Sequence, residues 1–411
     1  MKKDILPGKK LATVSLIYSM IFLAVSFTIA SPILIEISDS IRSSVALAGL
    51  IFTFFTLGYI PGALLSNLVS KYVRRKILYS LILFFHFGLF ILFAYSKNLY
   101  SAYISFLLLG ICCGLLDVTV NTILVDLYRE NTGSSLNLVH VFFGFGAFLG
   151  SVISSQVVGR GFNWTASFYL TSCLILINFL ISLFIKLPAS ESYVRRGSLG
   201  RSRSNMGSEA ASIDNMSKLA IGILLLLIFA QFCSNATQNG FNMWMPTFLR
   251  VERGFSGLFA GQILSFFWII IGIGRFVIGM ISRKIKLEKI LMFLSFFCFI
   301  FAVISVVVNN RLIELISFLF MGAFLSGIFP SMIAIGSIYF EERKSLVISI
   351  LVTFGVMGGL FSSFFMSMIY KITGNLQIGM FAIASFMSIA FVILIIFYLI
   401  NKGKIITQDG I

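Results

Sequence analysis

The sequence predicts an all-α integral membrane protein with twelve transmembrane helices in two pseudo-symmetric six-helix bundles. The chain has 411 residues, of which 58% are hydrophobic and only 11% charged, with a mean hydropathy of +1.01. Soluble domains carry charge at about a quarter of their positions. Apolar stretches of about 20 residues, long enough to cross a bilayer core as a helix, recur along the chain. One long polar segment interrupts them near the middle, and sequence motifs repeat on either side of it.

The predicted spans follow one another with short connections. The first six lie near 11–34, 44–68, 76–96, 99–127, 134–158 and 164–186, and the last six near 218–241, 255–281, 288–307, 310–338, 344–371 and 376–400. The long connection is rich in Ser, Arg and Gly, a composition that cannot bury enough apolar surface to fold alone. We therefore expect a first bundle over residues 1–186, a cytoplasmic linker over 187–217 and a second bundle over 218–411.

The same composition excludes several classes of protein. Long uninterrupted apolar runs exclude a β-barrel, whose strands alternate in polarity. The basic N-terminal segment enters the first span without a small-residue cleavage site, so we expect an uncleaved helix. No nucleotide-binding motif of the type Gly-x4-Gly-Lys-Ser/Thr, metal-binding Cys spacing or activated nucleophile occurs. We expect no enzymatic activity, no metal and no cofactor.

Lys and Arg residues predict the orientation of the chain in the membrane. With the N-terminus inside, most of the 31 Lys and Arg residues fall in cytoplasmic segments, as the positive-inside rule requires. Both termini are then cytoplasmic, and we expect a multi-pass protein of the cell membrane. The net charge of +16 reflects this topology and attraction to anionic lipid head groups. Because the basic residues are scattered over short loops, we expect no nucleic-acid partner.

Internal repeats relate the two halves. The triplet Lys76-Ile-Leu after span two recurs as Lys289-Ile-Leu after span eight, each behind a basic cluster and a small residue at the same spacing. The run 145–150, Phe-Gly-Ala-Phe-Leu-Gly, resembles 354–359, and Pro32 at the end of span one corresponds to Pro246 at the end of span seven. Duplicated halves are typical of secondary transporters. Glycine pairs such as Gly58/Gly62, Gly110/Gly114 and Gly146/Gly150 predict close helix approach.

Asp117 is the most informative polar residue within the spans. An ionised side chain at a span centre costs about 2.5–3.5 kcal/mol on insertion scales, and Asp117 lies about ten residues, roughly 15 Å of helix, from the inner end of span four. Asn121 follows at i+4 on the same face. Asn137 and His140 share one face of span five. Because burial disfavours a charged carboxyl, Asp117 is the candidate for cation coupling; the alternative is a hydrogen-bonded residue that joins two helices.

Span seven carries a stripe of amides. Gln231, Asn235, Gln238 and Asn242 recur at i, i+4, i+7 and i+11, and Trp244 follows near the outer end. Each amide offers donors and an acceptor, which suits a neutral polyol, and Trp244 could stack on a sugar ring. The alternatives are amides that bridge helices and a tryptophan that anchors the membrane interface.

Basic residues near the inner ends of the spans are candidates for gating or charge pairing. Arg275 lies within span eight, where it either reaches the cytoplasm or pairs with an acid such as Asp117. Lys71, Arg74 and Arg75 form the basic loop after span two.

This loop and the twelve-span architecture resemble the major facilitator superfamily. The family pattern is Gly-x-Leu-x-Asp-Arg-x-Gly-Arg-Arg, and Ser66, Leu68, Lys71, Arg74 and Arg75 keep its shape. In the family the loop latches the inward side closed through its acid. Ser70 stands in place of that acid here, and Val73 replaces the glycine.

Spans four and five resemble the fucose permease and sodium-glucose branch of that superfamily. The run 114–122, Gly-Leu-Leu-Asp-Val-Thr-Val-Asn-Thr, and the run 135–147 that opens Ser-Leu-Asn-Leu-Val-His carry the resemblance. It implies that Asp117 is the helix-four acid that couples a cation to a sugar. Asn121, Asn137 and His140 match the branch's neighbouring polar positions. The run 238–248 also resembles the branch's seventh helix, although a Glu is frequent where Gln238 stands.

The leading hypothesis is therefore a secondary active transporter, a monomer in the lipid bilayer, that carries a sugar or similar neutral polyol with H⁺ or Na⁺. One alternative is a drug or metabolite efflux antiporter of the same superfamily; such antiporters tend to carry a Gly-Pro pair in helix five, which 143–146 lacks. The non-transport alternative is a membrane scaffold or signalling protein.

Overall fold

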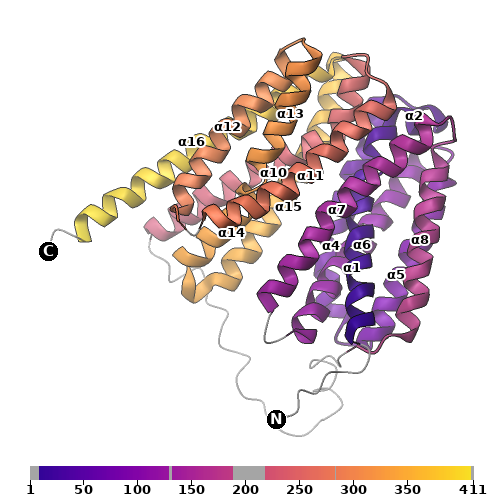
Figure 1. The fold of residues 1–411 in the computed structure, drawn as a ribbon, viewed down its shortest axis with the longest axis horizontal. Helices are drawn as coiled ribbons and strands as arrows, with labels where there is room; N and C mark the ends of the chain where they lie inside the picture. Colours follow the sequence, from indigo (N-terminus) through magenta and orange to yellow (C-terminus); the bar gives the residue numbers. More distant parts are fainter. Residues whose placement is uncertain (1–8, 129–131, 188–217, 283, 409–411) are drawn as a thin grey trace, which may run out of the picture. The chain divides into compact units, whose positions relative to one another are not determined.

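The computed structural model describes residues 9–128, 132–187, 218–282 and 284–408, with the side chains of Asn67, 132–140, Lys218, Ser345 and 401–408 outside that description. The described residues are helical with short connections and contain no strand. Twelve of their helical segments are long and apolar enough to cross a membrane. Figure 1 shows the helices coloured in their order along the chain. The all-α transmembrane fold class is confirmed.

The helices of the first half are α1 Lys9–Thr28, η1 Ser31–Ile33, α2 Leu34–Ser40, α3 Val45–Ala48, α4 Leu50–Val69, α5 Arg75–Ala94, α6 Leu99–Leu127, α7 Thr132–Gly159 and α8 Thr165–Phe184. Those that follow are α10 Lys218–Val251, α11 Gly257–Ile281, α12 Leu287–Val307, α13 Arg311–Leu325, α14 Ile328–Tyr339, η4 Glu341–Arg343, α15 Lys344–Thr373 and α16 Leu376–Gln408. Their bounds match most of the predicted spans to within a few residues.

By its internal contacts the chain divides into two compact units. The first comprises the described residues of Met1–Arg201 together with Phe255–Trp268, and the second those of Ser202–Gly254 and Ile269–Ile411. The predicted boundary at 187–217 stays a prediction, because 188–217 lies outside the described residues. Within the first unit α1 packs on α7, α4 on α6, and α5 on α8; within the second α10 packs on α15, and α12 on α13 and α16.

Proline explains two differences from the predicted spans. Span seven was expected near 218–241 with Pro246 at its end, but α10 continues through Pro246 to Val251. A proline removes only one backbone donor, and transmembrane helices tolerate this loss. Span ten was expected to be continuous, but it is interrupted after Leu325. Pro330 has no N–H to donate to the carbonyl of Ser326, so the regular helix breaks there.

Glycines set the closest helix contacts of the first unit, as the sequence predicts. A Cβ atom built on Gly58 would lie 2.1 Å from the carbonyl oxygen of Leu107, and one on Gly110 would lie 2.0 Å from that of Phe55. Gly62 and Gly114 meet the opposing backbone at 2.2 Å in the same way. Helices α4 and α6 therefore touch backbone to backbone, a distance that no larger residue allows.

The repeat predicted from the sequence has a counterpart in side-chain contacts. Arg75 and Asp126 form an ion pair between α5 and α6. In the alignment that superposes the two Lys-Ile-Leu triplets without gaps, their equivalents are Glu288 and Tyr339. The Tyr339 hydroxyl donates to Glu288 Oε1 at 2.9 Å. Both halves thus join the same two helices with a polar pair, although the residue types differ.

Candidate functional site

Asp117 lies half-buried on α6, where groups from two helices hold its carboxylate. The Tyr59 hydroxyl of α4 donates to Asp117 Oδ2. The Asn121 amide donates to Asp117 Oδ1 at 2.8 Å and to its backbone oxygen at 3.0 Å. Asn121 Oδ1 is buried without a hydrogen-bond partner among the described residues. The predicted pairing of Asp117 with Asn121 is therefore present, and Tyr59 adds a contact that sequence spacing could not reveal.

The glycine contacts of α4 and α6 explain why Tyr59 reaches Asp117. Gly114 lies one turn before Asp117's own position, and a Cβ atom there would lie 2.2 Å from the Tyr59 carbonyl oxygen. Tyr59 stands between Gly58 and Gly62, which allow α6 the same close approach. The two backbones are thereby held close enough for a direct side-chain hydrogen bond.

Aromatic rings surround the Tyr59 side of this site. The ring of Phe27 on α1 lies 5.6 Å from that of Tyr59 and 5.9 Å from that of Phe143 on α7, measured between centroids. Phe143 in turn lies 6.2 Å from Trp268, which belongs to the same unit. Aromatic walls with a few convergent polar groups are typical of small-molecule sites. Phe27 and Phe143 do not stand out in the sequence, because phenylalanine occurs in every predicted span.

Two predicted site residues have side chains outside the described residues. Asn137 and His140 lie within the helical part of α7, which begins at Thr132, but only their backbone is described. Their roles stay predictions.

In α10 the amides face α15. A Cβ atom on Gly355 of α15 would lie 3.1 Å from Asn235 Nδ2 and 3.3 Å from Gln231 Nε2. Gln231 is fully buried, and neither of its amide atoms has a hydrogen-bond partner among the described residues. Asn239, which the sequence analysis did not single out, continues this row opposite Gly359. Glycines on α15 thus give the amides of α10 their space.

The rest of the predicted stripe is packed differently. Gln238 is half-buried and Asn242 is buried. Trp244 is fully buried, with its ring 6.2 Å from that of Tyr370 on α15. Its Nε1 has no hydrogen-bond partner among the described residues. In this conformation Trp244 offers no open ring face, so stacking on a solute would require α10 and α15 to move apart locally.

The basic candidates differ in their surroundings. Lys71 and Arg74 are exposed in the connection between α4 and α5. Arg75 pairs with Asp126, and their side chains are 10% and 20% exposed. Arg275 is half-buried on α11, and its Nε is buried without a hydrogen-bond partner in the described part of the chain. Arg75 of the basic loop therefore has a defined acidic partner in Asp126. This acid lies on α6 and not at Ser70, where the family pattern has its acid.

We expect Arg75→Ala to destabilise the first unit by more than the about 1 kcal/mol of an exposed ion pair and by less than the about 3–5 kcal/mol of a buried one. The reason is the intermediate exposure of both partners. Thermal unfolding of the purified protein in detergent measures the effect. Lys71→Ala, at an exposed position of the same loop, is the control and should match wild type. Equal losses for the two variants would contradict a specific role for the Arg75–Asp126 pair.

A second buried charge pair lies in the second unit, just beyond the C-terminal end of α10. Arg253 Nε donates to Glu314 Oε1 at 3.1 Å, and the two side chains are 7% and 1% exposed. Arg253 Nη2 donates to the Val306 carbonyl oxygen at 2.6 Å, and its guanidinium lies 4.8 Å from the Phe248 ring centre. Neither residue stands out in the sequence, because their burial depends on packing against α12 and α13.

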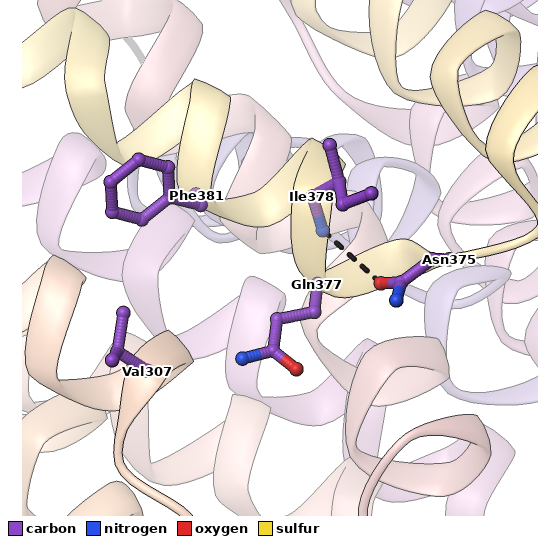
Figure 2. A pocket seen from close by; sticks show the side chains of 5 residues that line it. All are labelled: Val307, Asn375, Gln377, Ile378 and Phe381. Atoms are coloured by element: carbon purple, nitrogen blue, oxygen red, sulfur yellow. Dashed lines mark hydrogen bonds between the residues drawn. The ribbon is translucent and has the colours of Figure 1, made fainter.

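A pocket of about 270 Å³ opens beside this pair, between the end of α12 and the start of α16. It is lined by Val307, Asn375, Gln377, Ile378 and Phe381. Figure 2 shows the Asn375 side chain capping α16, where its Oδ1 accepts from the Ile378 amide at 3.2 Å. The lining is mainly apolar and includes none of the predicted site residues, so this pocket is separate from the Asp117 site.

Comparisons with known proteins agree with this architecture. The glucose/mannose transporter GlcP of Bacillus subtilis (strain 168) is 24% identical over 337 residues, which cover 81% of each chain. The crystal structure of the xylose transporter XylE from E. coli superposes with a TM-score of 0.73 at 15% identity, covering 94% of this chain and 98% of XylE. The E. coli fucose:proton symporter FucP gives 0.61 at 19% identity, covering 95% and 99%.

A family model decides the assignment. Residues 16–312, well over half of the chain, match the model of the Major Facilitator Superfamily. The helices of this chain, their order and the loop motif after α4 agree with that match. The chain therefore belongs to the Major Facilitator Superfamily and is a multi-pass membrane transporter, not an enzyme.

Proposed function

We propose that the chain is a cation-coupled symporter of a sugar or similar neutral polyol, working by alternating access in the cell membrane. The observation that carries this proposal is the Asp117 site. A carboxylate is kept within a membrane span, held by two neutral donors and bordered by aromatic rings. Intramembrane acids are costly and mark ion pathways.

Buried amides within the spans of each unit support a hydroxyl-rich solute. Among the described residues, Asn121 Oδ1 is a buried acceptor without a donor, and Gln231 in the second unit has both an unpaired acceptor and unpaired donors. Unpaired buried amides cost free energy until a partner arrives. Solute hydroxyls, which both donate and accept, are suitable partners. The names of the relatives GlcP, XylE and FucP point to sugars as well.

Further parts of the proposal follow from the sequence. We place both termini in the cytoplasm, as the distribution of Lys and Arg indicates, and we expect one chain to act alone. The coupling ion is H⁺ or Na⁺, and Asp117 is its binding group. No observation in the described residues favours the efflux antiporter or the scaffold protein over this reading.

We expect Asp117→Asn to abolish accumulation of solute against its gradient while exchange of preloaded solute persists. The amide keeps the shape of the site but cannot bind and release the cation. The measurement is uptake of radiolabelled glucose, mannose, fucose and xylose into proteoliposomes under an imposed pH or sodium gradient. Cys173→Ser, at an exposed position outside the site, is the control and should match wild type. Wild-type accumulation by Asp117→Asn would refute coupling at this residue, and efflux of drugs without sugar uptake would favour the antiporter.

A further inference from the structure

The hydroxyl of Tyr59 occupies a decisive position beside Asp117. We propose that Tyr59 is a positioning residue that transmits the protonation state of Asp117 to the bound solute, and that the coupling ion is a proton. This inference rests on the proposed function and names the ion and the residue that link the two cargoes. It is carried by the hydrogen bonds that α4 and α6 make with one carboxylate.

The hydrogen bonds show which form of Asp117 the site now holds. Tyr59 donates to Oδ2 and Asn121 donates to Oδ1, so both carboxylate oxygens act as acceptors. An ionised carboxylate is an acceptor only, and this arrangement fits it. Asn121 donates its amide hydrogens to Asp117, and its own side-chain oxygen is buried without a donor in the described part of the chain.

Protonation reverses the role of Tyr59. When water on one side delivers a proton to Asp117 Oδ2, a new O–H bond forms there and must find an acceptor. The nearest one is the Tyr59 oxygen, which can accept instead of donate. The Tyr59 hydroxyl hydrogen then turns about its C–O bond toward a solute oxygen. When the proton leaves Oδ2 for water on the other side, Tyr59 donates to the carboxylate again and the solute loses that donor.

The ligand set favours a proton over a metal cation. A proton can be added along the existing Tyr59–Asp117 hydrogen bond without moving either oxygen. The hydrogens of Tyr59 and Asn121 that point at the carboxylate oxygens would have to turn away before a metal cation could bind those oxygens.

The titratable groups Cys113 and His86 near Asp117 have partners of their own. Cys113, one turn earlier on α6, lies with its sulfur 3.9 Å from His86 Nε2 of α5, and that nitrogen is 2.9 Å from the Ser26 hydroxyl of α1. On the side of α1 and α7, the ring of Phe27 lies beside that of Tyr59 and the ring of Phe143 beside that of Phe27. The side chain of His140 on α7 lies outside the described residues. The Tyr59 hydroxyl is a titratable group that donates directly to the Asp117 carboxylate.

The transport test compares Tyr59→Phe with Tyr103→Phe. Both remove one hydroxyl, but Tyr103 lies near the start of α6, well before Asp117, and donates to the Leu47 carbonyl oxygen at 2.7 Å. In wild type and Tyr103→Phe, the half-saturating concentration of the labelled sugar should fall about tenfold between alkaline and acidic pH, as expected for one gained hydrogen bond. In Tyr59→Phe this ratio should approach one, and accumulation driven by a pH gradient should be lost.

Infrared difference spectroscopy gives a test on the wild-type protein without any solute. Acidification should produce a protonated-carboxyl band and shift a tyrosine C–O band, and both changes should be absent from Asp117→Asn. A carboxyl band without a tyrosine shift would overturn the inference even if Tyr59→Phe failed to fold.

The outcomes separate this inference from the proposed function. If Asp117→Asn loses accumulation while Tyr59→Phe keeps the wild-type pH ratio, the role of Tyr59 is refuted and symport stands. Accumulation driven by a sodium gradient at constant pH would refute the proton. If Asp117→Asn accumulates sugar like wild type, the proposed function fails and the inference fails with it.

Discussion

Gly110→Ala is expected to destabilise the first unit and to impair transport at the same time. The added methyl group would lie 2.0 Å from the Phe55 carbonyl oxygen and 3.0 Å from the Tyr59 backbone nitrogen. These neighbours are backbone atoms, so α4 as a whole must move away from α6. Overpacking of this kind costs about 1–3 kcal/mol or more. The functional loss follows because the displaced backbone carries the Tyr59 hydroxyl to Asp117.

Gly88→Ala is the matched control for this substitution. Gly88 lies in α5, and a Cβ atom there would meet nothing within 4 Å. The control should therefore be neutral, or stabilise by up to about 1 kcal/mol through higher helix propensity. Thermal unfolding in detergent and sugar uptake in proteoliposomes measure both variants. If Gly110→Ala unfolds at the wild-type temperature and transports normally, α4 and α6 do not need the contact that this glycine allows.

The transmembrane helices were predictable because a span in lipid is specified by length and composition alone. Local interruptions were less predictable. The same residue type, proline, is tolerated inside α4 at Pro61 and inside α10 at Pro246, yet Pro330 accompanies a break between α13 and α14. Whether a helix continues past a lost hydrogen bond depends on what packs around it, and a single sequence does not contain that information.

The candidate site was predictable in part for the same reason. Asp117 and Asn121 share a helix, so the spacing i, i+4 was enough to predict that they lie together. Tyr59, Phe27 and Trp268 come from other helices, and only the packing of those helices brings them into one aromatic cluster. In α10 the helical period predicted an amide row, but the row that faces α15 continues through Asn239, a distinction of orientation that periodicity leaves open.

Arg253→Met is expected to destabilise the second unit by about 3–5 kcal/mol, the usual cost of removing one partner from a buried ion pair. Glu314 is 1% exposed, and its Oε2 already lacks a hydrogen-bond partner among the described residues. Without Arg253, the carboxylate would remain buried with no compensating charge. The Val306 carbonyl oxygen would also lose its Arg253 donor and keep only the amide of Gln377 among its described side-chain donors. Thermal or denaturant-induced unfolding in detergent measures the loss.

The double variant Arg253→Met/Glu314→Leu decides whether the loss comes from the stranded charge. Replacing both partners of a buried pair by apolar residues is often neutral or stabilising, so the double variant should recover most of the stability that Arg253→Met loses. Acidification should likewise rescue Arg253→Met, because a neutral Glu314 no longer requires a counter-charge, whereas the double variant should not respond to pH in this way. A double variant no more stable than Arg253→Met would instead assign the loss to the contacts that Arg253 makes with Val306 and Phe248. The ion pair would then contribute little, and the guanidinium would act mainly by joining α10 to α12.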